Sequence, residues 1–179
     1  MIFREAPLAG AFLVELDRRP DDRGYFARSF CVDEFAAHGL PTAVIQCNVS
    51  FNRTRGTLRG MHFQRAPMAE AKLVRCTRGA IYDVIVDLRP ESTTYCRWYG
   101  FELTEQNGSA LFIPEGFAHG FQTLADNSEV FYQMFAGYSP EHADGVRWDD
   151  PAFGIVWPLP VSSMAEKDKL FALLKDKGK

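Results

Sequence analysis

Two histidines of this chain lie in segments that combine glycine with apolar residues. His62 lies within Gly56–Gln64 (GTLRGMHFQ), and His119 lies within Gly108–Phe121 (GSALFIPEGFAHGF). An imidazole changes charge near neutral pH, so it can bind a metal ion, transfer a proton or serve as a hydrogen-bonded core residue. For His119 taken alone, the core interpretation is as good as the functional one, whereas the basic surroundings of His62 favour a functional role.

The spacing of these segments resembles the two motifs of the cupins. The spacing G-x5-P-x-G-x2-H ends at His119, and the first motif, G-x5-H-x-H, is matched except that Gln64 stands at its second histidine. A cupin metal site usually takes two histidines and a carboxylate from the first motif and one histidine from the second. Because a catalytic metal needs about three protein ligands and an open position, we expect a cupin-like shell that holds no metal. A metal-dependent cupin, such as a dioxygenase or a sugar isomerase, stays open as an alternative and requires a third ligand beside His62 and His119.

Short strands make up most of the secondary structure that the sequence predicts. Apolar, aromatic and β-branched runs between glycine, asparagine and proline predict strands over Ala11–Leu16, Thr42–Asn48, Leu58–Phe63, Ala71–Thr77, Ala80–Leu88, Trp98–Thr104, Ser109–Ile113, Gly120–Leu124 and Glu129–Phe135. Helices are expected over Val32–His38 and Ser163–Lys175, a polar turn over Asp17–Gly24, and an ordered arm over Pro151–Pro160. Many short strands at regular spacing predict a sandwich, a barrel or a jelly roll.

One predicted strand carries acidic residues among apolar ones. Side chains of a strand alternate between its two faces, so Ile81, Asp83 and Ile85 share one face. A carboxylate among apolar neighbours must be paired or functional, because its desolvation is otherwise costly.

Composition bounds the class of protein. The chain has 179 residues, 46% hydrophobic and 24% charged, which is typical of a soluble globular protein, and its length predicts a single domain over residues 1–179. A net charge of −3 argues against nucleic acid or a membrane as a partner. The acid-free stretch Phe35–Ala69 holds four arginines, which either meet a small anion or simply face solvent.

Features of targeting are not evident in the sequence. It has no run of 18 apolar residues and no basic segment followed by an apolar stretch near Met1. The four cysteines are widely spaced and form no CxxC pair, so we expect reduced thiols in a cytoplasmic protein.

Taken together, the motifs resemble the dTDP-4-dehydrorhamnose 3,5-epimerase family of nucleotide-sugar epimerases. The segments LRGMHFQ and IPEGFAHGF are the most specific part of this resemblance, which runs from about residue 20 to residue 168. The matching stretches are Asp22–Phe26, Gln46–Asn48, Leu58–Gln64, Lys72–Arg75, Asp83–Arg89, Ile113–Phe121, Glu129–Tyr132, Trp148–Pro151 and Glu166–Asp168. The resemblance implies a mainly β fold, a cupin-type jelly roll (double-stranded β-helix) with a few short helices. It also implies a homodimer whose N-terminal strands cross to the partner sheet.

The reaction that the resemblance implies needs no cofactor. A ketone acidifies the hydrogen on the neighbouring carbon, so a base can form an enolate and an acid across the ring can return a proton with inverted configuration. The absence of a GxGxxG motif and of a full set of metal ligands agrees with this chemistry. The implied reaction inverts C3 and C5 of dTDP-4-dehydro-6-deoxy-D-glucose to give dTDP-4-dehydro-L-rhamnose, a step of deoxysugar and polysaccharide biosynthesis. A single-centre epimerase or isomerase acting on another nucleotide-linked deoxysugar is the alternative.

The resemblance also implies residue roles. His62 is the base, Asp168 orients its imidazole, and Tyr132 is the acid. Without the resemblance, Asp168 would be interpreted as a solvated acid and Tyr132 as a half-buried strand residue. Lys72 and Arg59 are expected on strands beside the His62 strand, where they face the sugar and phosphates. Tyr138 is implied to stack on the nucleotide base, and Asp83 is expected as the buried partner of His119. The other implied substrate contacts are Arg23, Gln46, Asn48, His119, Tyr138 and Lys167.

Three positions depart from the family pattern. Arg28 and Ala143 stand where many members carry glutamate, and Glu70 replaces a usual glutamine. Losing an acid beside a hydroxyl or a base edge can change which nucleotide or sugar is recognised. A catalytically silent sugar-binding cupin is a third hypothesis, which the joint presence of His62 and Tyr132 disfavours.

Overall fold

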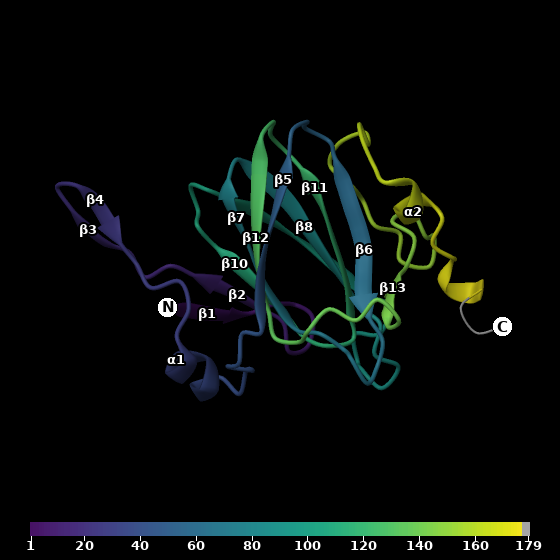
Figure 1. Ribbon diagram of the computed structural model, residues 1–179, viewed down its shortest axis with the longest axis horizontal. Coiled ribbons are helices and arrows are strands. Elements are labelled where there is room, and N and C mark those ends of the chain that lie inside the picture. The colour runs from purple at the N-terminus through teal and green to yellow at the C-terminus, as the bar shows by residue number, and fades with distance from the viewer. Residues whose placement is uncertain (177–179) are drawn as a thin grey trace.

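Two antiparallel β-sheets face each other in the computed structural model, whose described residues are 1–176 (Figure 1). The six-stranded sheet has the order β1 (Ile2–Glu5), β2 (Phe12–Glu15), β10 (Ala110–Ile113), β7 (Lys72–Arg78), β12 (Ser128–Met134) and β5 (Gln46–Asn52). The five-stranded sheet has the order β13 (Ala143–Gly145), β6 (Leu58–Gln64), β11 (Phe117–Thr123), β8 (Ala80–Asp87) and β9 (Trp98–Thr104). The predicted mainly β fold is confirmed.

Short elements flank the sheets. The strands β3 (Arg19–Asp21) and β4 (Gly24–Phe26) pair as a hairpin that projects away from both sheets, at the far left of Figure 1. Helix α1 (Val32–Ala37) follows the hairpin, and α2 (Glu166–Lys169) and a 3₁₀ turn (Leu174–Asp176) lie near the C-terminus. Among residues 1–176, no helix is long and apolar enough to cross a membrane.

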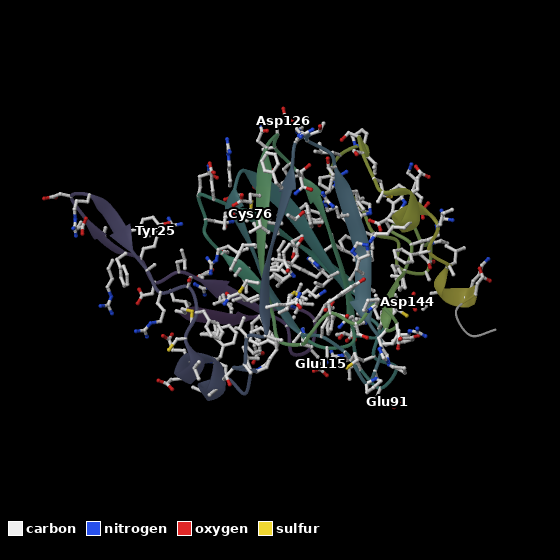
Figure 2. The ribbon with its side chains drawn as sticks, viewed as in Figure 1. Tyr25, Cys76, Glu91, Glu115, Asp126 and Asp144 are labelled. Atoms are coloured by element: carbon white, nitrogen blue, oxygen red, sulfur yellow. The ribbon has the colours of Figure 1, made fainter. Side chains whose placement is uncertain are left out.

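Apolar side chains form three layers. The central layer lies between the sheets and includes Val74 of β7, Ile85 of β8 and Phe121 of β11. Phe35 of α1 packs on the outer face of the six-stranded sheet. The C-terminal segment covers the outer face of the five-stranded sheet, where Phe153, Ile155 and Trp157 pack as expected for an ordered arm. Figure 2 shows side chains filling the space between the sheets.

The short edge strands β1 and β13 were not predicted, and three predicted segments differ from the structure. The strand predicted over Thr42–Asn48 instead runs from Gln46 to Asn52. The apolar residues just before Gln46 form no strand, and Ile45 is 59% exposed. The expected turn Asp17–Gly24 contains β3 and leads into β4. The predicted helix Ser163–Lys175 is wrong except for the single turn of α2, and Leu170 directly after that turn is 79% exposed.

Candidate active site

A cavity of about 290 Å³ opens between the two sheets. Side chains from both sheets line it, so a ligand inside would be contacted from opposite faces. Its polar lining residues include, from the six-stranded sheet, Gln46, Asn48, Ser50, Lys72 and Tyr132, from the five-stranded sheet, Arg59, His62 and His119, and from connecting segments, Glu70 and Tyr138. Eight of the predicted site residues therefore meet in one cavity.

Two glycines bring the histidine strands unusually close together. His62 of β6 and His119 of β11 are direct neighbours in the strand register, and the register shifts between His119 and Phe121. A Cβ atom on Gly60 would lie 2.5 Å from the Cα atom of Gly120. Only glycine permits such an approach of two backbones, so the spacing LRGMH in β6 and HGF in β11 sets the position of both imidazoles.

His62 is paired with a carboxylate from the C-terminal arm. Its Nε2 lies 2.8 Å from Oδ1 of Asp168, while the Gly60 N–H donates to Oδ2 at 3.2 Å. The Asp168 side chain is 2% exposed and the His62 side chain is 39% exposed. Burial by itself would raise the pKa of Asp168, but the hydrogen bonds from His62 and Gly60 hold that pKa below its ordinary value. Because an ionised carboxylate only accepts hydrogen bonds, Nε2 carries the proton and Nδ1 is the nitrogen that can take one.

Tyr132 faces the cavity from the sheet opposite His62. Burial is the main cause that raises the pKa of its phenol, and the nearby Asp83 carboxylate adds to the effect, against smaller opposing contributions from Arg59 and Ser50. The phenol therefore stays protonated at neutral pH and can donate a proton into the cavity.

Two cations line the same cavity, at positions that differ from the expectation. Arg59 lies on the His62 strand itself, and Lys72 lies on β7 of the opposite sheet, so neither is on a strand beside β6. Arg59 Nε donates to Asn52 Oδ1 at 2.7 Å. The Lys72 ammonium donates to Glu70 Oε1 at 2.8 Å, and both side chains are at least nine-tenths buried.

His119 forms the second histidine–aspartate pair, as predicted. Its Nε2 lies 2.7 Å from Oδ1 of Asp83, and the two side chains are 5% and 0% exposed. The His119 ring meets the Tyr132 ring edge to face, with centroids 6.2 Å apart. The Nε2 atoms of both cavity histidines thus face carboxylates, and Gln64 is bound to backbone groups. Among residues 1–176, no group of three histidine, cysteine or acidic side chains could hold a metal ion.

A second cavity of about 360 Å³ adjoins the first. His62, Glu70 and Tyr138 line both cavities, and Lys167 of α2 and Ala143 of β13 line the second alone. Tyr138 is 64% exposed, and its N–H donates to Gln46 Oε1 at 3.3 Å. The predicted contacts Tyr138 and Lys167 therefore lie at one end of a continuous set of lining residues.

Comparison with known proteins agrees with this arrangement. Residues 5–176 match the family described as dTDP-4-dehydrorhamnose 3,5-epimerase. The chain belongs to the dTDP-4-dehydrorhamnose 3,5-epimerase family. A dTDP-4-dehydrorhamnose 3,5-epimerase from Sinorhizobium fredii is 44% identical over 94% of this chain and 87% of its own length. The crystal structure of that enzyme from Bacillus anthracis, with TDP and PPi bound, has a TM-score of 0.93 at 40% identity and covers 97% of this chain and 99% of its own. A dTDP-4-dehydrorhamnose 3-epimerase from Streptomyces niveus is 36% identical over 99% of this chain and 87% of its own length.

Arg23 is the one predicted contact of the epimerase family that does not reach either cavity. It lies on the projecting hairpin, where its guanidinium bonds Asp21 Oδ2 at 2.7 Å. Figure 2 shows the same displacement for Tyr25 of β4, which lies well outside the sheets. Arg28 likewise pairs with Glu34 beside α1, so within one chain its replacement of an acid does not alter the cavity. Ala143 does line the second cavity, at the edge strand β13.

Sequence reasoning missed residues that hold the predicted ones in place. Asn52 orients Arg59, and Ser50 interacts with the Tyr132 phenol. Both lie on β5, where polar residues occur at every second position from Gln46 to Asn52. That alternation is a usable signal, and it was lost because the strand was predicted to end at Asn48.

Proposed function

We propose that this isomerase inverts carbon centres beside the ketone of a nucleotide-linked 4-keto-6-deoxyhexose by proton transfer alone. The observation that carries the proposal is the placement of His62 and Tyr132 on opposite walls of one cavity. Inversion requires a base on one face of the sugar ring and an acid on the other, and this geometry supplies both.

The residues act in sequence on one carbon, from which one side chain removes a proton and to which another adds a different one. Nδ1 of His62 takes the proton from the carbon next to the ketone, and the electron pair of that C–H bond moves into an enolate. The buried Asp168 carboxylate stabilises the imidazolium that results. The ammonium of Lys72 stabilises the negative charge that forms on the enolate oxygen, and the guanidinium of Arg59 binds the diphosphate. Tyr132 then donates its proton to the opposite face of the same carbon, and solvent restores both side chains.

The family supports dTDP-4-dehydro-6-deoxy-D-glucose as the substrate, with inversion at C3 and C5 giving dTDP-4-dehydro-L-rhamnose. Gln46, Asn48 and His119 contact the sugar and phosphates, and Tyr138 stacks on the base with Lys167 nearby. A single-centre epimerase is a second candidate, favoured by the relative that is named a 3-epimerase.

We further propose that the working form is a homodimer. The hairpin leaves Tyr25 50% and Phe26 73% exposed, and the edge strand β5 leaves Val49 61% and Phe51 45% exposed. Exposed aromatic residues beside an open sheet edge favour association with a second copy. In such a dimer the hairpin would carry Arg23 to the cavity of the partner. The single domain and the cytoplasmic location stay predictions.

Deuterium incorporation tests the function. Incubation of the enzyme with dTDP-4-keto-6-deoxyglucose in D₂O should place deuterium at C3 and C5, as detected by NMR. Incorporation at one carbon alone would identify a single-centre epimerase, and none with folded enzyme would refute the proposal. A Tyr132→Phe variant should still exchange the hydrogen that His62 removes, while formation of inverted product falls roughly 10²-fold.

A further inference from the structure

Gln64 occupies the position where the first cupin motif has its second histidine, and its side chain makes three backbone hydrogen bonds. Its Nε2 donates to the carbonyl oxygen of Met68 at 2.8 Å and to that of Gly137 at 3.1 Å. Its Oε1 accepts from the Ser139 N–H at 2.7 Å. Gln64 is 3% exposed, so both donors and the acceptor are used in a shielded site.

Two of these bonds go to the residues directly before and after Tyr138 in the sequence. Gly137 and Ser139 are its immediate neighbours, and a Cβ atom on Gly137 would meet no atom within 4 Å. The Tyr138 side chain is itself 64% exposed, so packing alone does not fix its ring. The backbone on each side of Tyr138 is therefore held by Gln64, with a longer bond to Gln46 at Tyr138 itself.

The Gln64 side chain also connects the loop around Tyr138 to a second loop, the turn that follows β6. Met68 lies in the turn that follows β6, and the N–H of Arg65 in that turn donates to the His142 carbonyl oxygen at 2.9 Å. The turn leads to Glu70, which lines both cavities with Tyr138. A glutamine can bridge these segments because it donates and accepts at once, whereas a leucine of similar size does neither.

We propose that Gln64 is a positioning residue that fixes the backbone around Tyr138 and thereby sets the affinity for the nucleotide half of the substrate. The second part rests on the proposed function, in which Tyr138 stacks on the base. Gln64 lines the second cavity with Tyr138 but is not a lining residue of the first cavity, which Tyr132 lines, so its loss should weaken binding far more than it slows proton transfer.

Hydrogen exchange tests the positioning without any substrate. In Gln64→Leu, the amides of residues 137–139 should exchange at least about tenfold faster, because the acceptor of the Ser139 N–H is gone. Gln122→Leu is the matched control, because Gln122 is also a buried strand glutamine and brackets the backbone of Leu159 through both side-chain atoms. The control should leave the exchange of residues 137–139 unchanged. Equal protection of these amides in Gln64→Leu and the wild type would overturn the inference.

A double-mutant cycle with dTDP as the probe tests whether Gln64 affects the binding of the nucleotide through Tyr138. Gln64→Leu should raise the Kd for dTDP and the KM about tenfold while kcat stays within about threefold. In a Tyr138→Ala background, the same substitution should have almost no further effect on the Kd. Additive losses, or a loss confined to kcat, would contradict the proposal.

A second variant guards against a folding defect. Gln64→Glu keeps the shape and the acceptor for Ser139 but loses both donors, so the Ser139 amide should keep more of its protection than in Gln64→Leu. Uniformly faster exchange across the sheets would instead indicate a general structural role and refute positioning. If the wild type binds no dTDP, the proposed function fails, and hydrogen exchange still decides whether Gln64 holds the loop.

Discussion

The chain contains two histidine–aspartate pairs whose histidines are neighbours on the adjacent strands β6 and β11, and the pairs differ in burial although their hydrogen bonds are similar in length. The Nε2–Oδ1 distance is 2.8 Å in His62–Asp168 and 2.7 Å in His119–Asp83. His62 is 39% exposed in the cavity, whereas His119 is 5% exposed. Identical chemistry in two environments therefore supports two roles, proton transfer at the open pair and support of the cavity wall at the buried one.

The carboxylates differ as well. The second oxygen of Asp168 accepts the Gly60 N–H, whereas among residues 1–176 the second oxygen of Asp83 is buried without a hydrogen-bond partner. The Asp83 charge still acts on the site, because after burial it is the next cause that raises the pKa of Tyr132. The buried pair thus helps to keep Tyr132, the proposed acid, protonated.

The largest effect is expected at the open pair. His62→Ala should lower the rate of deuterium incorporation roughly 10²–10⁴-fold, since a general base in position contributes about that much. The apparent Tm should fall less than in a variant of the buried pair, because the imidazole is partly solvated. Near-normal exchange in a folded His62→Ala variant would remove the proposed base from the mechanism.

The buried pair should respond in stability. His119→Leu leaves the buried Asp83 carboxyl without its partner, which should cost about 3–5 kcal/mol of unfolding free energy. The double variant His119→Leu/Asp83→Leu should recover part of that loss, because it buries no charge. Urea unfolding measures both variants, and a fully additive further loss in the double variant would show that the pair does not act as a unit.

Asp168→Asn should have an intermediate effect on activity. An amide in place of the carboxylate neither stabilises the imidazolium nor enforces the proton on Nε2, so kcat should fall roughly 10²-fold. The KM should stay nearly constant, because Asp168 is not a lining residue of either cavity. A change mainly in KM would indicate that Asp168 contacts the ligand.

The smallest effect is on the pH dependence of stability. The pKa of Asp168 is lower in the folded chain than in the unfolded one, so its contribution to stability is complete above the ordinary carboxyl value of about 4. It is lost as the pH falls through the folded pKa, because the unfolded chain then binds more protons. The free energy of unfolding should therefore fall less in Asp168→Asn than in the wild type when the pH is lowered from about 5 to about 3. Urea titrations of both proteins at these two pH values measure the difference.

Much of this arrangement could be predicted from local sequence. Apolar and β-branched runs predict β6, β7, β8 and β9 to within a residue or two. Strand alternation places Asp83 among apolar residues and predicts that it is paired or functional, and the structure shows it paired with His119. The β3–β4 hairpin escaped prediction because its six strand residues are all exposed, so no apolar alternation marks it.

Other features depend on distant contacts. Asp168 lies 106 residues beyond His62, so the pair was implied only by resemblance. The leucines near the C-terminus predicted a helix with Leu170 inward, yet Asp168 is the residue that turns inward and the helix lasts one turn. Gln64 was interpreted as a lost metal ligand, since the loop that it holds is more than 70 residues away.

The route of the C-terminal arm has a consequence for biosynthesis. Every lining residue of the first cavity, the one between the two sheets, is synthesised by residue 138, before the segment that carries Asp168. Asp168 arrives later, when the arm lies along β6 through the bridge from Thr57 to Ser163. A product that ends between residues 138 and 168 would contain every lining residue of this cavity but would lack the carboxylate that hydrogen-bonds His62, the proposed base.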